Sequence, residues 1–181
     1  MAPFTDTLRK STHSSHQMVD KHEFVTLIRT DKCSGKIYVH FNQVCINVIQ
    51  NTLKNTNNKL IKTDFYKKMY RDIEHFDFFI SENLLKLLDR CEDYPLEHSY
   101  LFHLALLFGG NLLTKFLPES TEFFKFENGS TIIKDFKEYI NKTVDTKEKQ
   151  ESFINIVNES YKIIELIFDD FYRKYSNKIN N

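Results

Sequence analysis

Glycine and proline are so scarce in this chain that they restrict the folds open to it. Only four Gly and three Pro occur among 181 residues. A sheet of many strands reverses direction often, and its turns depend on these two residue types. We therefore expect an all-α fold with long helices. The length suits one domain with a single core, spanning residues 1–181.

Apolar residues recur at helical spacing along most of the chain, and no segment shows convincing strand alternation. A single-domain helical bundle of about seven helices is the expected architecture. Thr5 or Asp6 is expected to cap the first helix, and Ser34-Gly35 to begin the third. The other helices are expected over 22–30, around 65–73, around 84–88 after a cap at Ser81, behind Pro95, over 131–143 and over 148–175.

The first helix carries a histidine on its expected inward face. The apolar row there follows i, i+4, i+7, i+8 and i+11, which places His16 among the buried positions. A histidine in such a place is usually a satisfied core residue, but a neutral imidazole on a helix is also the axial ligand of many haem proteins. His13 and His16 resemble half of a di-iron site, but no second pair at matching spacing supports one. The row consists of Leu8, Thr12, Ser15, His16 and Val19.

Gly109 and Gly110 interrupt one of the most apolar segments of the chain, residues 100–117. Each glycine inside a helix costs about 1 kcal/mol relative to alanine, so the pair costs about 2 kcal/mol and favours a kink. Two explanations remain open. Either a flat ligand lies closer to the helix backbone than a Cβ allows, or another helix crosses it at close range.

The charge balance excludes some classes of partner. Lys and Arg number 25, as do Asp and Glu, so the formal net charge is zero. Without a basic excess, non-specific binding of nucleic acid or of an anionic membrane is not expected. His103, Asn111 and Lys115 make the apolar segment a poor transmembrane helix, and the N-terminus lacks the pattern of a signal peptide. We therefore expect no membrane anchor.

The three cysteines indicate a reducing environment. Cys33, Cys45 and Cys91 are widely spaced, odd in number and not arranged as Cys-x-x-Cys. Such spacing favours neither a zinc site nor a disulfide framework. A soluble, cytoplasmic protein is therefore expected.

Three segments, in order, resemble the haem oxygenase family over nearly the whole chain. Residues 8–16, Leu-Arg-Lys-Ser-Thr-His-Ser-Ser-His, resemble the family's first helix, in which the final His is the proximal haem ligand. Residues 103–111, His-Leu-Ala-Leu-Leu-Phe-Gly-Gly-Asn, resemble the distal-helix motif Tyr-Leu-Gly-Asp-Leu-Ser-Gly-Gly-Gln. Residues 122–128, Glu-Phe-Phe-Lys-Phe-Glu-Asn, resemble the connector Phe-Phe-x-Phe-x-Asn.

The resemblance implies that haem lies between the first helix and a kinked distal helix. His16 would bind the iron, and Gly109 and Gly110 would let the porphyrin approach the distal backbone. Tyr161 matches an aromatic residue that packs on the macrocycle. The family places a propionate arginine where Asn141 stands. The propionate partners that the resemblance implies are Arg9, His13, Lys137, the adjacent Lys142, and Tyr100 as a hydroxyl donor.

The distal helix departs from the family pattern at its catalytic position. Leu106 stands where the family has an Asp that orders a water network for proton delivery, and leucine cannot relay a proton. His103 precedes it by three residues and is the candidate substitute. The catalytic candidates are therefore His16, His103, Gly109 and Gly110, with Leu106 as a residue of the haem pocket.

The activity that the resemblance implies is haem cleavage. Haem, dioxygen and electrons from a ferredoxin or an NADPH-dependent reductase would give biliverdin, carbon monoxide and ferrous iron. Haem would be both substrate and cofactor, while the protein supplies orientation and protons. Two alternatives remain: a protein that binds haem or a bilin with little turnover, and a helical scaffold that acts through protein contacts.

Overall fold

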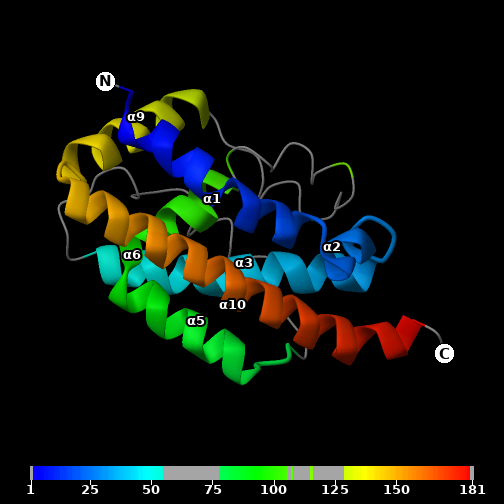
Figure 1. Ribbon diagram of the computed structural model, residues 1–181. Coiled ribbons are helices and arrows are strands. Elements are labelled where there is room, and N and C mark those ends of the chain that lie inside the picture. Colours follow the sequence, from blue (N-terminus) through cyan, green and yellow to red (C-terminus); the bar gives the residue numbers. More distant parts are fainter. Residues whose placement is uncertain (1, 55–77, 106, 108–114, 116–128, 180–181) are drawn as a thin grey trace.

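The computed structural model describes residues 2–54, 78–105, 107, 115 and 129–179 (Figure 1). Helices account for nearly all of these residues, and the described part contains no strand, which confirms the all-α prediction. The expected helix around 65–73 and the connector at 119–128 lie outside it. The described helices are α1 (Phe4–Asp20), α2 (Glu23–Ile28), α3 (Lys32–Leu53), α5 (Glu82–Asp93), α6 (Pro95–Ser99), the π-helix η2 (Tyr100–Leu104), α9 (Gly129–Thr143) and α10 (Lys147–Ile179).

The long helix α10 organises the bundle. It contacts α1, α2, α5 and α6, while α3 packs against α2, α5, α6 and η2. Figure 1 shows α3 and α5 running in one direction and α10 in the other, with α9 beside the first half of α1. Helix α10 thereby links the first helix of the chain to the segment that begins at α6.

One buried face of α10 supplies much of the core, as its sequence pattern predicts. Phe168 packs on the rings of Phe24 and Phe41, and Phe171 contacts the same two rings. Helix α3 also has a broad buried surface, which includes the polar side chains of Asn42, Gln43 and Gln50. The buried residues of α10 are Phe153, Val157, Ser160, Tyr161, Ile164, Ile167, Phe168, Phe171 and Tyr175.

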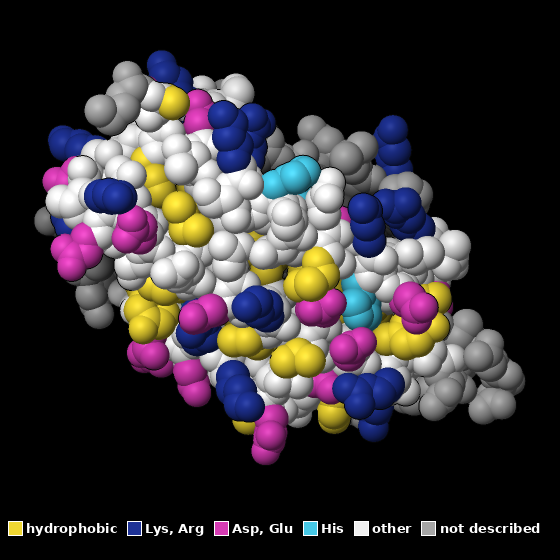
Figure 2. All heavy atoms as spheres, in the orientation of Figure 1, with side chains coloured by type: hydrophobic (Ala, Val, Ile, Leu, Met, Phe, Trp, Pro, Cys, Tyr) yellow, Lys and Arg dark blue, Asp and Glu magenta, His cyan; other side chains and the backbone are white. Residues whose placement is uncertain are grey.

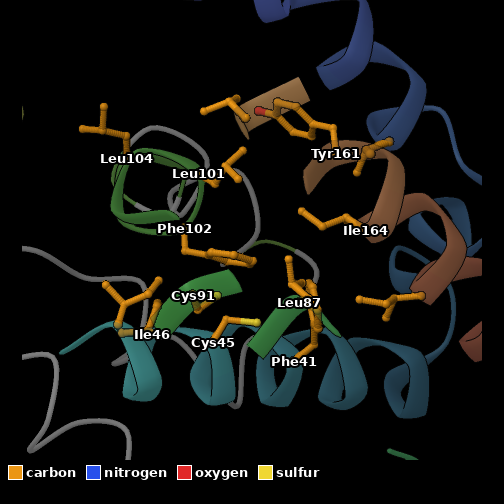
Figure 3. Close-up of a cluster of buried hydrophobic side chains, with 14 of the residues drawn as sticks. Phe41, Cys45, Ile46, Leu87, Cys91, Leu101, Phe102, Leu104, Tyr161 and Ile164 are labelled. Carbon is orange, nitrogen blue, oxygen red and sulfur yellow. The ribbon is translucent and has the colours of Figure 1, made fainter. Parts of the chain in front are cut away.

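Two of the three cysteines meet in the core. Figure 3 shows Cys45 of α3 and Cys91 of α5 side by side beneath Phe102 of η2. Both are buried free thiols. Burial raises the pKa of the Cys45 thiol, and the neighbouring Cys91 raises it further. Thiols held protonated in this way are poor nucleophiles and behave as small core residues.

The predicted helix starts are partly right. Ser81 caps α5, where its hydroxyl oxygen accepts a hydrogen bond from the Leu84 amide at 3.2 Å, and Pro95 occupies the first turn of α6. The expected caps of the first and third helices are wrong. Helix α1 already begins after Pro3, and α3 begins after Asp31, whose carboxylate accepts hydrogen bonds from both the amide and the hydroxyl of Ser34.

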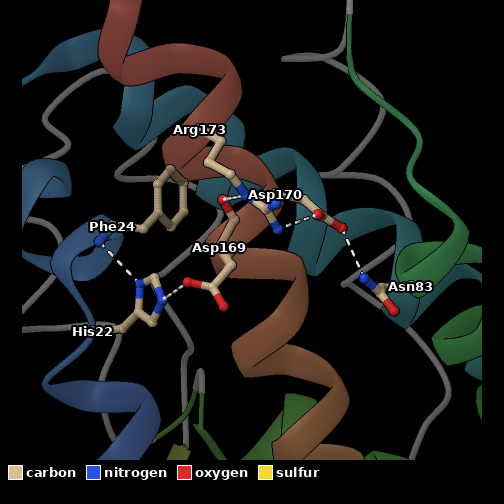
Figure 4. A network of polar contacts seen from close by, with 6 residues as sticks. All are labelled: His22, Phe24, Asn83, Asp169, Asp170 and Arg173. Carbon is tan, nitrogen blue, oxygen red and sulfur yellow. Dashed lines mark hydrogen bonds and ion pairs between the residues drawn. The ribbon is translucent and has the colours of Figure 1, made fainter.

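A polar network holds α2 and α5 against the second half of α10 (Figure 4). His22 caps α2, because its Nδ1 accepts a hydrogen bond from the Phe24 amide at 3.1 Å, so its Nε2–H donates to Asp169 at 3.2 Å. Asp170 accepts from Asn83 of α5 at 2.9 Å and from Arg173 at 3.2 Å. This end of the bundle is therefore fixed by side-chain hydrogen bonds as well as by the core.

The face shown in Figure 2 carries interspersed acidic and basic side chains, with hydrophobic side chains in small separate patches. It has no extended region of one charge sign, in keeping with the balanced composition. Among the described helices, none has both the length and the apolar character needed to cross a bilayer.

Candidate functional site

His16 lies on the exposed side of α1, which corrects the expectation that it is buried. Its side chain is 47% exposed, whereas Leu8, Thr12 and Val19 of the same row are buried. Successive residues of an α-helix are rotated by about 100° around its axis, so His16 points about 70° away from the mean direction of the other residues of the row. His16 therefore lies at the edge of the buried stripe. The His16 imidazole is therefore anchored by its position on α1, while about half of its side chain is accessible to a ligand.

Two contacts orient the His16 ring. Its Nδ1 lies 3.1 Å from a carboxylate oxygen of Asp20, one turn further along α1. The ring also meets Tyr161 of α10 edge-on, with ring centroids 5.7 Å apart and an interplanar angle of 81°. When Nδ1–H points to a carboxylate, the lone pair is on Nε2, as in many metal-binding histidines. With this orientation, Nε2 is the ring nitrogen of His16 that is able to accept a ligand.

Two tyrosines extend the site from α10 and η2. Tyr161 is buried, and burial, followed by the nearby Tyr100, raises the pKa of its phenol. Burial also raises the pKa of the Tyr100 phenol, although a hydrogen bond with Thr12 and the positive charge of Arg9 oppose the rise. Both phenols therefore remain protonated at neutral pH and are able to donate hydrogen bonds. Tyr161 thus contacts His16, Tyr100 lies near Tyr161, and Arg9 lies near Tyr100.

His103 lies in η2 and is buried, with 5% of its surface exposed. Burial lowers the pKa of its imidazole to about 4, although a hydrogen bond with the backbone of Ser99 acts in the opposite direction. His103 is therefore neutral at pH 7. The π-helical turn that holds it is a rare element that is often found at functional sites.

Helix α9 braces the start of α1 through Asn141. The Thr5 amide donates to Asn141 Oδ1 at 2.9 Å, and Asn141 Nδ2 donates to the Thr5 hydroxyl at 3.3 Å. One of the first amides of α1 therefore gains a partner from another helix. Lys137 is half-buried on α9 and Lys142 is exposed near its end. His13 is exposed on α1, three residues before His16.

Three candidate residues cannot be placed beside these groups. Leu106, Gly109 and Gly110 lie outside the described residues. The close approach of a ligand to the Gly pair and the consequence of leucine at position 106 therefore stay predictions.

The sequence analysis missed three residues of the site. Asp20 stands four residues after His16, and Thr12 stands four residues before it. Both spacings place side chains on one face of a helix, so the spacing alone could have indicated them. Asn158 of α10, which accepts a hydrogen bond from the Ser15 hydroxyl at 2.7 Å, had no comparable signal. The hydrogen bond between Asn158 and Ser15 forms only because α1 and α10 pack together.

The described part of the site offers one accessible imidazole, that of His16. Among the residues that the structure describes, no three His, Cys, Asp or Glu side chains are grouped so that they could hold a metal ion. One oriented and accessible imidazole is instead the kind of ligand that porphyrin iron takes from a protein. Aromatic rings and hydrogen-bond donors beside it suit a flat, partly anionic molecule.

The sequence matches no protein-family model and no curated protein. Solved structures with a similar fold include haem oxygenase-1 from the cyanobacterium Synechocystis sp. PCC6803 in complex with haem, with a TM-score of 0.82 and 14% sequence identity over 99% of this chain and 96% of that chain. They also include haem oxygenase from Leptospira interrogans, with a TM-score of 0.75 and 15% identity over 93% of this chain and 100% of that chain. The fold of this chain is therefore that of the haem oxygenases, as the resemblance predicted.

Proposed function

We propose that the protein binds haem with His16 as the axial ligand and cleaves it as a haem oxygenase. The observation that carries the proposal is the His16 imidazole, which is accessible on α1 and oriented by Asp20 and Tyr161 within a haem oxygenase fold. The carboxylate on Nδ1 makes the imidazole a stronger ligand and fixes its ring plane. Tyr161 restricts rotation of the ring from the side of α10.

The remaining residues have roles that suit a porphyrin. Arg9 and the Tyr100 hydroxyl would hold a propionate beside α1, because anionic groups at the edge of a pocket need charged or hydrogen-bonding partners. The further propionate partners in the proposal are His13, Lys137 and Lys142. Tyr161 would pack on the macrocycle, and Gly109 and Gly110 would allow it to approach the distal backbone.

Bound haem would supply the iron and the porphyrin carbon atoms that react with dioxygen, to give biliverdin, carbon monoxide and ferrous iron. The chain's own task is then to orient the ring, exclude water and deliver protons. His103 is the described residue that we propose for proton delivery. Because it is neutral at pH 7, it has both an N–H donor and a lone-pair acceptor. The reductase that supplies electrons and a cytoplasmic location are also parts of this proposal.

A second candidate function is haem or bilin binding without efficient turnover. Leu106 favours it, because leucine cannot order water where the family has an acidic residue. The two functions share the proximal site around His16 and differ in proton delivery.

Titration with hemin, followed by ascorbate or a reductase in air, separates these functions. We expect a shifted Soret band that saturates at one hemin per chain, and then a bilin spectrum with release of carbon monoxide. Saturation without a bilin product would support the binding function. A hemin spectrum unchanged by the folded protein would contradict both functions.

Leu106→Asp is expected to raise the rate of bilin formation if proton delivery limits turnover. General acid catalysis by a positioned group contributes about 100-fold or more, so a gain of at least tenfold should be measurable in single-turnover absorbance traces. Leu106→Asn is the matched control, since it adds a polar group of similar size that has no acidic proton. Equal rates in all three proteins would show that another group, such as His103, already delivers the proton.

A further inference from the structure

A fully buried histidine, His98 of α6, joins the segment leading into η2 to the middle of α10. Its Nδ1 lies 2.8 Å from the Tyr94 carbonyl oxygen, and its Nε2 lies 2.9 Å from the Ser160 hydroxyl. Both His98 and Ser160 have no exposed surface. The hydrogen bond between them spans 62 positions of the sequence and is the kind of contact that fixes two helices in register.

The hydrogen-bond pattern determines the protonation of this pair. A carbonyl oxygen only accepts, so His98 Nδ1 carries the proton and Nε2 accepts from the Ser160 O–H. The Ser160 oxygen in turn accepts from Arg90 Nε at 3.2 Å, and Arg90 Nη2 donates to the Ile156 carbonyl at 3.3 Å and to Glu159 at 3.1 Å. Burial lowers the pKa of His98 to about 4, so the neutral form persists at pH 7.

The pair is close in sequence to the two tyrosines of the candidate site. Ser160 directly precedes Tyr161, whose ring contacts His16. His98 lies two residues before Tyr100, which reaches Thr12 on α1. A shift of α6 relative to α10 would therefore change the distance between Tyr100 and Tyr161. No contact of His98 or Ser160 with the haem site itself is needed for this effect.

We propose that His98 and Ser160 are positioning residues, whose hydrogen bond sets how far the η2 segment (Tyr100–Leu104) lies from α10 and thus the spacing of Tyr100 and Tyr161 in the proposed haem site. The proposal rests on the proposed haem-binding function for its consequence, but the positioning of the segment is a property of the protein without ligand. Because the pair is separated from the reacting groups, substitutions there should change the fit of the ligand and leave its axial coordination intact.

Ser160→Ala tests the proposal, with Asn83→Ala as a matched control. Ser160→Ala removes the hydrogen bonds of its hydroxyl with His98 and Arg90, and Asn83→Ala removes the hydrogen bond with Asp170 at the other end of α5. The exposed Ser152→Ala is a second control for the loss of a serine hydroxyl from α10. We expect Ser160→Ala to weaken hemin binding about tenfold, which corresponds to about 1.4 kcal/mol. We expect both controls to bind hemin within about twofold of the parent, since they leave the site unchanged.

Amide hydrogen exchange on the ligand-free proteins supplies a second measurement. Exchange in residues 98–104 should accelerate in Ser160→Ala and stay as in the parent for Asn83→Ala, with thermal midpoints measured alongside. His98→Ala should lose amide protection in residues 98–104 and hemin affinity. His98→Gln keeps a side-chain acceptor and should therefore retain part of both. Equal losses of hemin affinity or protection in Ser160→Ala and Asn83→Ala would reduce the pair to a general stabilising contact and overturn the proposal. If the parent does not bind hemin, the proposed function fails, while the exchange data still decide whether the pair positions this segment.

Discussion

His16→Ala is expected to remove the axial nitrogen ligand from hemin bound to this protein and to weaken hemin binding roughly a hundredfold. Loss of an outer partner of a metal ligand already lowers affinity by about 10- to 100-fold, so loss of the ligand should have at least that effect. His16 is largely exposed and its substitution leaves no cavity in the core, so the fold should persist. The measurement is a hemin titration that follows the Soret band and the ferric spin state.

His13→Ala is the matched control, because His13 is an exposed histidine on the same helix, one turn earlier. It should retain the axial ligand and lose at most a contribution to propionate binding. Added imidazole should restore the ligand band of His16→Ala, since the space left by the side chain accepts the free base. A parent-like ferric spectrum in His16→Ala would show that iron takes its ligand elsewhere, and the proposed orientation of haem would be abandoned.

Acidification is expected to destabilise the ligand-free protein steeply between pH 6.5 and about pH 4. Burial lowers the pKa of both His98 and His103 to about 4, whereas histidine in an unfolded chain has a pKa of about 6.5. Between these values the unfolded chain binds protons that the folded protein does not. The stabilisation is therefore complete above pH 6.5 and is lost as the pH falls through the folded pKa. Each histidine accounts for about 3 kcal/mol of unfolding free energy.

Urea unfolding at pH 7.5, 5.5 and 4.5 measures this dependence. Glu97 opposes it in part, because burial raises the pKa of its carboxyl and its protonation below neutral pH favours the folded state. His98→Gln should reduce the loss of unfolding free energy between pH 7.5 and 4.5 by roughly half, because His103 is then the remaining histidine that burial keeps neutral. Ser152→Ala, which changes an exposed residue without a titratable side chain, should leave the slope unaltered. Unfolding free energies that stay level from pH 7.5 to 4.5 would mean that both imidazoles are already hydrated in the native protein.

Much of the fold could be predicted from the sequence, because its helices depend on local periodicity. The apolar stripe of α10, the Ser81 cap and the position of Pro95 are all confirmed. The start of α3 was placed three residues too late, because Ser34 and Gly35 are usual boundary residues and the stronger acceptor is the Asp31 carboxylate. The π-helical register of η2 has no sequence signature, since it follows from packing.

The candidate site was less accessible to sequence analysis, because tertiary contacts define it. The row containing Leu8 and Val19 located the buried stripe of α1, but it could not tell that His16 lies at its edge. Ser160 falls on the apolar side of the last helix by its spacing, but the burial of His98 against it had no local signal. The resemblance predicted His16 as the proximal ligand, and the structure adds Asp20 beside it and a contact between Thr12 and Tyr100.

The contact between His16 and Tyr161 joins the first described helix to the last, across nearly the whole sequence. During synthesis, the N-terminal histidine leaves the ribosome long before its aromatic support on α10 has been made. Until then the His16 imidazole on α1 lacks the contact with Tyr161 that helps to orient it. Under the proposed function, ligand capture at His16 would consequently be a late event in the biogenesis of this protein, and premature termination before α10 would leave a chain with the histidine but without the aromatic ring that packs against it.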